Sequence, residues 1–375
     1  MINKFETPYG TFILDRDIDE NNRSLQAWSS ADLYILDTLK DYDIPEKSQI
    51  LIMNDAYGAL TAALSGQFSI YHYNDSYCSE KECRKNLENN KISADLIRFI
   101  HPDEKLPENI SLVIMKNPKS LNYLEYQLQL VAEQIPEGVD VLAADMSKNI
   151  HSSTVALYEH YLNNAKTSLA WKKSRLVQGK TDGKKEAINQ FPVEYTPLNE
   201  PYKIINYPNL FAHGRLDPGT AFLVDNFPFV ANHKHVVDLA CGDGILALKA
   251  ASKWPEAEIL CVDESWLAVK SAKESLLKSS YTNRVDFKVT DVLEGVDKEW
   301  ADLVLCNPPF HSNYSISTAT ALKMFRESAQ VLKERGELFV VANRHLGYEN
   351  QLSKIFSKAQ VIKSNKKFSI IRAVK

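Results

Sequence analysis

The feature that most constrains the fold is an order of apolar strands and helices that occurs twice along the 375 residues. Residues 50–58, ILIMNDAYG, align with residues 236–244, VVDLACGDG. Residues 112–120, LVIMKNPKS, align in the same way with residues 303–311, LVLCNPPFH. Strands that alternate with helices are typical of parallel βαβ units. We therefore predict an α/β protein with an internal duplication, in which two sheets have a similar topology.

The two copies predict two domains with a basic segment between them. Residues 1–165 form the N-terminal copy, residues 201–375 form the C-terminal copy, and residues 166–200 read as a linker rich in Lys and Arg. A second basic tract closes the chain, with no acidic residue from Gln351 onward. On a chain of net charge -4, two such tracts favour local contact with a phosphate backbone. A solvated charged surface is the alternative explanation.

The composition narrows the class of protein. Charged residues make up 25% and apolar residues 44% of the chain, which is close to an average globular protein and argues against wholesale disorder. The five cysteines have no CxxC spacing, so we expect free thiols in a reducing cytoplasm and no zinc site. No apolar run is long enough to span a bilayer, and we expect no membrane attachment.

The stretch ADLVLCNPPF, residues 301–310, is a strand that runs into Asn307, two prolines and Phe310. A residue before proline is held extended, and the Asn307 carboxamide oxygen can accept a hydrogen bond. Pro308 and Pro309 have no N–H, so only carbonyls can face the pocket from this segment. Phe310 adds an aromatic face for a flat ring. The motif predicts a site that accepts protons from a planar amine, although a strand-ending turn is the structural alternative.

These groups suit methylation of an exocyclic amine, whose lone pair is normally delocalised into its ring. If the Asn307 oxygen and the Pro308 carbonyl accept its two N–H groups, the lone pair localises toward an in-line methyl donor. Catalysis then needs positioning and acceptors aimed at developing positive charge, and no strong base.

A second motif, DLACGDG, lies between a strand and a helix and predicts a nucleotide site. Gly242 and Gly244 permit a tight turn and close approach of the backbone to a ligand. The turn also fits the GxGxxA pattern of dinucleotide enzymes. However, Asp238, Asp263 and Asp291 lie near the ends of three consecutive predicted strands. Three acids suit a cationic sulfonium nucleoside better than they suit NAD, while helix capping is the structural alternative for any one of them.

The pair DLACGDG and NPPF resembles the class I S-adenosylmethionine-dependent methyltransferases that act on exocyclic amines. The NPPFH form, the upstream FAHGRLDPGTAFLVDNF and the doubled sheet resemble the bacterial guanine-N2 ribosomal RNA methyltransferases of the small and large subunits. ANRHLGY, NKKFSIIRAVK, LQAW and LAWKKSRL are most similar to the large-subunit members. The resemblance covers nearly the whole chain and is looser before residue 150.

The resemblance implies two tandem Rossmann-like class I methyltransferase domains with mainly parallel seven-stranded sheets. The N-terminal domain would be degenerate, would help to bind RNA, and keeps only Gly58 in its turn. The reaction would be methyl transfer from S-adenosylmethionine to N2 of a guanine in 23S ribosomal RNA. Ala240 departs from the family pattern, which often has glycine there, and His311 is left out of the catalytic set. The implied cofactor-binding residues are Asp217, Gly219, Asp238, Gly242, Gly244, Asp263, Asp291 and Asn307, and the implied catalytic residues are Asn307, Pro308 and Phe310.

Two other functions remain open from the sequence. The same chemistry can serve another nitrogen, such as a guanine of small-subunit ribosomal RNA, an adenine of DNA or a protein glutamine. A non-catalytic RNA-binding scaffold would use the basic tracts equally well. The acids at three strand ends and the NPPF motif argue for the enzyme, and failure to bind the cofactor would favour the scaffold.

Overall fold

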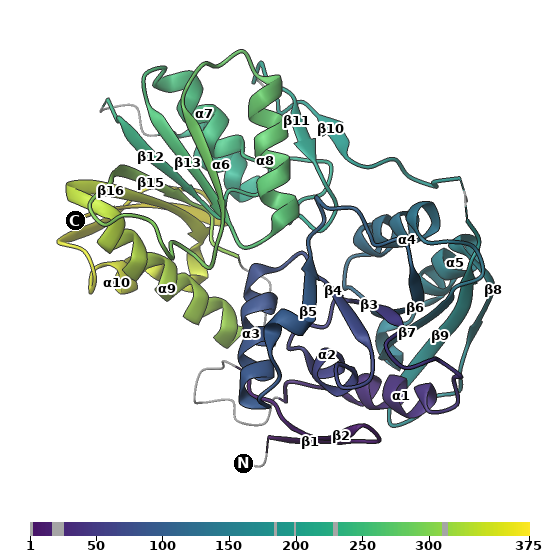
Figure 1. The fold of residues 1–375 in the computed structure, drawn as a ribbon. Helices are drawn as coiled ribbons and strands as arrows, with labels where there is room; N and C mark the ends of the chain where they lie inside the picture. The colour runs from purple at the N-terminus through teal and green to yellow at the C-terminus, as the bar shows by residue number, and fades with distance from the viewer. Residues whose placement is uncertain (1–2, 17–25, 184–185, 199, 228–231, 310–313) are drawn as a thin grey trace. The chain divides into compact units, whose positions relative to one another are not determined.

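The computed structural model (Figure 1) describes the chain except for residues 1–2, 17–25, 184–185, 199, 228–231 and 310–313. The chain divides into two compact units, Met1–Phe191 and Pro192–Lys375. Within the described residues each unit is built on one seven-stranded sheet. The predicted duplicated α/β fold is therefore confirmed.

The sheet of the N-terminal unit has the strand order β5-β4-β3-β6-β7-β9-β8. The strands in this order are β5 Ile97–Ile100, β4 Ser69–Tyr73, β3 Gln49–Met53, β6 Ile110–Lys116, β7 Asp140–Met146, β9 Ser174–Thr181 and β8 Leu162–Thr167. The first five strands are parallel, whereas β9 runs antiparallel to β7 and β8 runs antiparallel to β9. The central run from Ile50 to Met53 is fully buried, as expected for a parallel strand covered on both faces.

Helices cover both faces of this sheet (Figure 1). α1 Ser30–Leu39, α2 Ala59–Leu64 and α3 Tyr77–Asn89 contribute to the core on one face, and α4 Leu121–Gln134 and α5 Ser152–Tyr161 contribute to the core on the other. A small hairpin, β1 Lys4–Thr7 with β2 Gly10–Ile13, precedes them, and two short 3-10 turns, η1 Ala94–Leu96 and η2 Ser147–Asn149, lie in the connections. The two apolar layers explain why the central strands carry no polar face.

The C-terminal unit has the equivalent strand order, β14-β13-β12-β15-β16-β18-β17. The strands in this order are β14 Val285–Val289, β13 Glu258–Asp263, β12 His235–Leu239, β15 Ala301–Cys306, β16 Leu332–Asn343, β18 Phe368–Val374 and β17 Lys358–Ser364. The first five are parallel, and β18 is antiparallel to both of its neighbours. The two sheets therefore have the same topology.

The helices of this unit are also divided between the two faces of its sheet. α6 Pro218–Asp225, α7 Ile245–Lys253 and α8 Trp266–Lys278 contribute to one core, and α9 Tyr314–Val331 and α10 Tyr348–Leu352 contribute to the other. The short pair β10 Val193–Tyr195 and β11 Ile204–Asn206 packs beside α8, where Ile205 donates its N–H to the Ser275 hydroxyl at 2.9 Å. The 3-10 turn η3 Arg344–Leu346 follows β16.

The registers of the two sheets are equivalent at the strand ends that matter for the site. Met53 of β3 lies opposite Met115 of β6, and Leu239 of β12 lies opposite Cys306 of β15. In an open α/β sheet, ligands bind outside the carboxyl ends of the strands. Each unit therefore presents an edge of the same kind, formed by the turns that follow these four residues.

The first part of the segment predicted as a linker is instead folded into the N-terminal sheet. Residues 166–181 belong to β8, β9 and the turn between them, and Leu176 and Val177 are buried. Lys166 is compatible with its position on the edge strand β8, because edge strands of sheets commonly carry charged side chains. The boundary between the compact units falls between Phe191 and Pro192.

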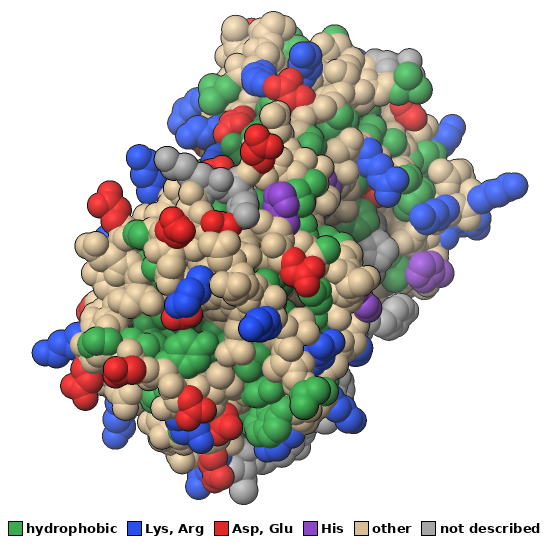
Figure 2. All heavy atoms as spheres, turned by 90° about the vertical axis from the view of Figure 1, so that its right-hand side faces the viewer, with side chains coloured by type: hydrophobic (Ala, Val, Ile, Leu, Met, Phe, Trp, Pro, Cys, Tyr) green, Lys and Arg blue, Asp and Glu red, His purple; other side chains and the backbone are tan. Residues whose placement is uncertain are grey.

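The surface carries both signs of charge. Figure 2 shows one face on which cationic and anionic side chains are interspersed among hydrophobic patches. In the part of the chain that the structure describes, no helix has the length and apolar character needed to cross a membrane. All five cysteines are free, and the described His, Cys, Asp and Glu side chains form no group of three suited to a metal ion. Contact with a nucleic acid on this face therefore requires a local cluster of cations.

Candidate active site

The glycine turn after β12 combines left-handed backbone with open space. Ala240, Gly242 and Gly244 have φ values of 58°, 54° and 82°. A Cβ atom at Gly244 would lie 2.9 Å from the Cα atom of Ala272, so glycine is required for close packing of α8. A Cβ atom at Gly242 would have no neighbour within 4 Å. The turn thus leaves room for a ligand at Gly242, and no such room exists at Gly244.

Ala240 is the one residue of this turn whose side chain opposes its backbone conformation. A left-handed alanine costs about 1 kcal/mol relative to an ordinary conformation, and glycine avoids this cost. We expect Ala240→Gly to raise the free energy of unfolding by about 1 kcal/mol, measured by urea denaturation. The exposed Lys298→Gly in the loop before β15 serves as the control that should not stabilise the protein. An unchanged or lower stability of Ala240→Gly would contradict the assignment of strain.

The acids predicted at the ends of β13 and β14 both lie at this edge, and both already have protein partners. Asp263 accepts the N–H of Gly242 at 3.1 Å and that of Ser265 at 3.0 Å, so its carboxylate connects the glycine turn to the start of α8. Asp291 forms an ion pair with Lys323 of α9 at 2.6 Å. The sequence did not indicate Lys323, because a cation on the following helix has no distinctive spacing.

Asp238 is fully buried at the end of β12 and is only partly satisfied. One oxygen accepts the Ala247 N–H at 2.9 Å, and Oδ1 has no hydrogen-bond partner among the described residues. Burial raises the pKa of Asp238 well above its usual value. A carboxylate in this state favours a nearby cation or donor, which would supply the missing interaction.

Asp243, in the same turn, is held by two residues that the sequence analysis did not select. Its Oδ2 accepts the Tyr195 hydroxyl at 2.7 Å and the Asn206 side-chain amide at 3.0 Å. Burial is the main reason that the pKa of Asp243 is raised. Both partners come from the small β10–β11 sheet, which thereby supports the glycine turn.

Asn307 follows β15 directly and lies beside the glycine turn, because Cys306 pairs with Leu239. Its Nδ2 group donates to the Asp217 carboxylate at 3.0 Å and to the Thr220 hydroxyl at 2.7 Å. The Oδ1 atom is buried and has no hydrogen-bond partner in the described part of the chain. Both hydrogens of the amide are used, and its acceptor is left over.

The partners of Asn307 determine which way its amide points. Asp217 caps α6 and accepts the N–H of Thr220 at 2.8 Å, so the carboxylate is anchored to the helix. Rotating the amide by half a turn would place Oδ1 against that carboxylate, which can only accept hydrogen bonds while ionised. The contacts therefore keep Nδ2 toward α6 and hold Oδ1 in the opposite direction.

Of three other residues predicted for the site, two are described in the structure and one is not. Pro308 is buried directly after Asn307. Gly219 is buried in the first turn of α6, where a Cβ atom would lie 3.0 Å from the Asp217 carboxylate and 3.3 Å from the Phe368 ring. Phe310, like His311, lies outside the described residues. The structure thus brings Asp217 and Asn307 together and adds Thr220, whose signal in the sequence was its position three residues after a capping aspartate.

Comparison with known proteins adds to this geometry. The family model described as RLMG N-terminal domain matches residues 2–183, and the one described as Methyltransferase small domain matches residues 201–372. The ribosomal RNA large subunit methyltransferase G of Pseudoalteromonas translucida is 39% identical over 97% of this chain and 96% of its own length. The protein of that name from Aeromonas salmonicida is 38% identical over 99% of this chain and 98% of its own. The chain belongs to the ribosomal RNA large subunit methyltransferase G family.

This membership confirms the family expected from the motifs. A solved structure adds support for the fold of this chain. The T. thermophilus 16S rRNA N2 G1207 methyltransferase, solved in complex with AdoMet and guanosine, has a TM-score of 0.77 and covers 99% of this chain and 97% of its own. At 19% identity, the likeness establishes the tandem fold over the full length.

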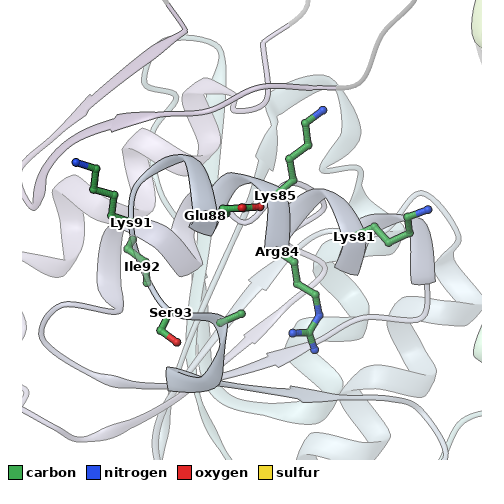
Figure 3. A pocket seen from close by; sticks show the side chains of 8 residues that line it. Lys81, Arg84, Lys85, Glu88, Lys91, Ile92 and Ser93 are labelled. Carbon is green, nitrogen blue, oxygen red and sulfur yellow. The ribbon is translucent and has the colours of Figure 1, made fainter.

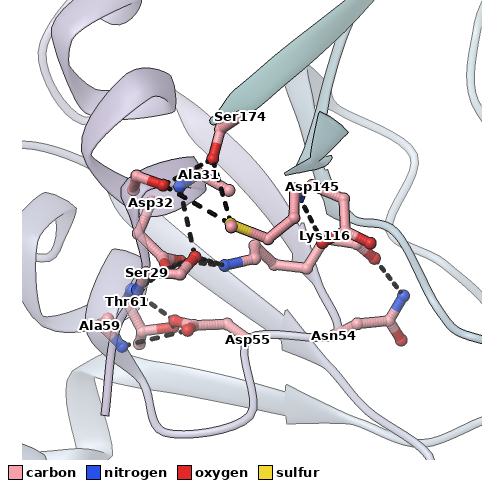
Figure 4. A network of polar contacts seen from close by, with 12 residues as sticks. Ser29, Ala31, Asp32, Asn54, Asp55, Ala59, Thr61, Lys116, Asp145 and Ser174 are labelled. Atoms are coloured by element: carbon pink, nitrogen blue, oxygen red, sulfur yellow. Dashed lines mark hydrogen bonds and ion pairs between the residues drawn. The ribbon is translucent and has the colours of Figure 1, made fainter. Parts of the chain in front are cut away.

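The N-terminal unit of this methyltransferase G family member carries a different residue at the position of Asn307. Since Met115 and Cys306 have equivalent registers, Lys116 occupies that position. Its Nζ atom bonds to the Asp32 carboxylate at 2.5 Å and to the Ser29 hydroxyl at 3.4 Å (Figure 4). An ammonium group has donors and no acceptor. The N-terminal edge therefore lacks the counterpart of the Asn307 oxygen.

The two strand-end residues bind their helices in the same way. Lys116 contacts the N-cap and third residue of α1, Ser29 and Asp32, whereas Asn307 contacts the N-cap and third residue of α6. The Asp32 side chain is 3% exposed, so the lysine neutralises a buried charge. The shared contact is a feature of the duplicated methyltransferase G fold, and only its C-terminal version leaves an acceptor available.

A separate basic hollow of about 690 Å³ lies along α3 and the loop that follows it (Figure 3). Its cations are Lys81, Arg84, Lys85 and Lys91. Arg84 is paired with Glu80 at 2.8 Å and lies 4.0 Å over the Phe99 ring, so it also contributes to the stability of the helix. The hollow contains none of the residues that the methyltransferase motifs select.

Proposed function

We propose that this member of the methyltransferase G family transfers the methyl group of S-adenosylmethionine to the exocyclic N2 of a guanine in 23S ribosomal RNA. The observation that carries the proposal is the Asn307 carboxamide, whose buried Oδ1 has no partner among the described residues. Its orientation is held by Asp217 and Thr220 beside the glycine turn. The shared name of the relatives supports large-subunit ribosomal RNA as the substrate.

The residues at the carboxyl edge of the C-terminal sheet fit S-adenosylmethionine. The Oδ1 atom of Asp238, which has no hydrogen-bond partner among the described residues, suits a cationic amino group, and the open space at Gly242 suits close approach of a ligand. Asp263 would take ribose hydroxyls, and Asp291 would accept from the adenine amine, with Lys323 shifting its contact. Asp217 and Gly219 would lie against the methionine end. When bound, the cofactor supplies an electrophilic methyl group on a sulfonium.

The Asn307 side chain would act as an acceptor for the substrate amine. Its Oδ1 atom takes one N–H of the amine and the Pro308 carbonyl takes the other, which localises the nitrogen lone pair. These neutral oxygens also stabilise the positive charge that develops on nitrogen, and they act more strongly because the site is buried. The surplus proton then leaves to water. The acceptor pair suits any planar exocyclic amine, so N2 of guanine is the finer part of the proposal.

The test is methyl transfer from labelled S-adenosylmethionine into deproteinised RNA. We expect label in 23S ribosomal RNA from cells that lack this gene, and little label in the same RNA from cells that carry it. Digestion and mass spectrometry should locate the label as N2-methylguanosine at one nucleotide. DNA, small-subunit ribosomal RNA and ribosomal protein serve as parallel substrates. Label confined to one of those, or to another atom of the base, would overturn the proposal.

A further inference from the structure

The tip of the β8–β9 hairpin brings together a half-buried aromatic side chain, an exposed aliphatic one and two exposed cationic ones. Leu169 is 89% exposed, and Lys172 and Lys173 are exposed as well. Trp171 is half-buried between them. Large apolar side chains and lysines at the same exposed turn are not needed for the core, so their presence calls for another explanation.

Contacts within the tip hold Trp171 in place. The Tyr34 ring of α1 lies 5.2 Å from the Trp171 ring at an angle of 41°. The Tyr34 hydroxyl donates to the Leu169 carbonyl at 3.2 Å, which fixes the backbone on the other side of the tryptophan. Lys172 places Nζ 4.4 Å from the centre of the Trp171 ring. The result is a tryptophan ring supported by Tyr34, with the Lys172 ammonium over the ring.

The two residues of this turn are not of the types that its backbone conformation favours. Trp171 and Ser174 exchange two backbone hydrogen bonds of 2.8 Å, so Lys172 and Lys173 are the two residues of a tight hairpin turn. Their φ values are 45° and 67°. Two consecutive residues with positive φ are typical of a type I′ turn, where Asn-Gly is strongly preferred. A lysine at either position makes the turn less stable than asparagine or glycine would. Such a conflict between a residue and its backbone conformation is characteristic of functional sites.

The equivalent hairpin of the C-terminal unit shows what is special about this tip. There, Asn365 occupies the position of Trp171 and Phe368 that of Ser174, with the same hydrogen bond across the turn at 2.9 Å. Phe368 is only 6% exposed and packs against α6. The aromatic side chain of the C-terminal tip is therefore part of the core, whereas Trp171, at a different position of its own hairpin, stays partly exposed.

Further cations lie near the tip, at the same end of the sheet. Ser147 donates its N–H to the Lys173 carbonyl at 2.8 Å, which connects the tip to η2 and to the exposed Lys148. Arg175 donates to the Thr167 hydroxyl at 2.8 Å beneath the turn. No residue from 166 to 181 is acidic.

We propose that this tip docks an unpaired segment of the RNA substrate, and this inference rests on the proposed function. Lys172 leaves its position over the Trp171 ring, a base stacks on that ring, and Lys172 and Lys173 contact the adjacent phosphates. Unpaired RNA offers a flat ring and a phosphate within one nucleotide, and proteins bind it through aromatic platforms beside cations. An acidic protein surface would account for the lysines and would leave the supported tryptophan unexplained.

The test exploits the mismatch between the turn and its residues. Lys172→Asn with Lys173→Gly introduces the preferred turn residues and removes both charges, so the thermal midpoint should stay the same or rise. Binding of deproteinised 23S ribosomal RNA, measured by filter retention at several salt concentrations, should weaken about tenfold, and the slope of log K against log salt should fall by about 1.4. Trp171→Ala should weaken binding about tenfold with little change in that slope.

The matched control is Lys47→Gly. This exposed lysine has a φ of 66° and precedes β3, at the end of the sheet where the parallel strands begin. This variant should keep the RNA affinity and salt slope of the parent. Unchanged binding and slope in the turn variant would overturn the docking proposal. Because binding is measured without methyl transfer, a loss of binding in the tip variants supports docking even when no RNA is methylated. A failure to methylate any RNA would count against the proposed function and not against docking.

Discussion

Replacing Asn307 by alanine should lower kcat for methyl transfer about 10³-fold, the scale expected when a buried transition-state contact is removed. The substitution deletes Oδ1, the acceptor that has no partner among the described residues. It also leaves Asp217 and Thr220 bonded to each other at the start of α6, so the fold should persist. Single-turnover methylation and calorimetric titration of S-adenosylmethionine would measure the effect on chemistry and on cofactor binding separately.

The orientation of Asn307 provides a second measurement on the same prediction. Thr220→Val removes the hydroxyl that accepts from Nδ2 at 2.7 Å, while Oδ1 stays in the chain. The freed amide samples wrong orientations, so kcat should fall about tenfold with a small change in KM for RNA. Thr220→Ser keeps the hydroxyl and should recover most of the activity. Normal turnover in Asn307→Ala would refute the proposed role of the carboxamide.

Replacing Lys116 by methionine should destabilise the protein by about 3 kcal/mol. The lysine pairs with Asp32 at 2.5 Å, and the side chains are 19% and 3% exposed. Removing the cation leaves a buried carboxylate without its ion-pair partner, which destabilises the protein more than replacing both charged residues would. Urea denaturation monitored by intrinsic fluorescence would measure the loss.

Two controls test whether burial is the cause. Lys40→Met removes the C-cap lysine of α1 from its ion pair with Asp37, where the side chains are 50% and 51% exposed, and should destabilise the protein far less than Lys116→Met. Adding Asp32→Asn to Lys116→Met should restore part of the stability, because the stranded charge is removed. Equal losses in Lys40→Met and Lys116→Met would show that the buried pair has no special weight.

The equivalence of Lys116 and Asn307 also supports the idea that the N-terminal copy no longer binds the cofactor. An ammonium at that position would repel a sulfonium, and no acceptor replaces the missing carboxamide oxygen. The registers of the two sheets make these two positions equivalent, and the contact that each residue makes with the helix before its sheet became visible only in the folded chain.

The prediction from sequence was good where the signals are local. The run ending at Met53 and the run ending at Leu239 were recognised as strands from their apolar residues, and their glycine turns from Gly58 and Gly244. It was poor for β8 and β9, where lysines and arginine obscured an edge hairpin. The equivalent hairpin at the C-terminus carries a stronger apolar signal, FSII, in its second strand.

The sequence by itself determined the order of the strands and helices, the duplication, and the chemical groups at the strand ends. These follow from periodicity, proline and glycine over a few residues. Only the tertiary structure decided what those groups do, because Asn307 is oriented by Asp217 at a separation of 90 residues. Hydrogen bonds between distant strand ends and helix caps leave no periodic signal in the sequence. The direction of the Asn307 amide is therefore set by the tertiary structure and cannot be read from the sequence.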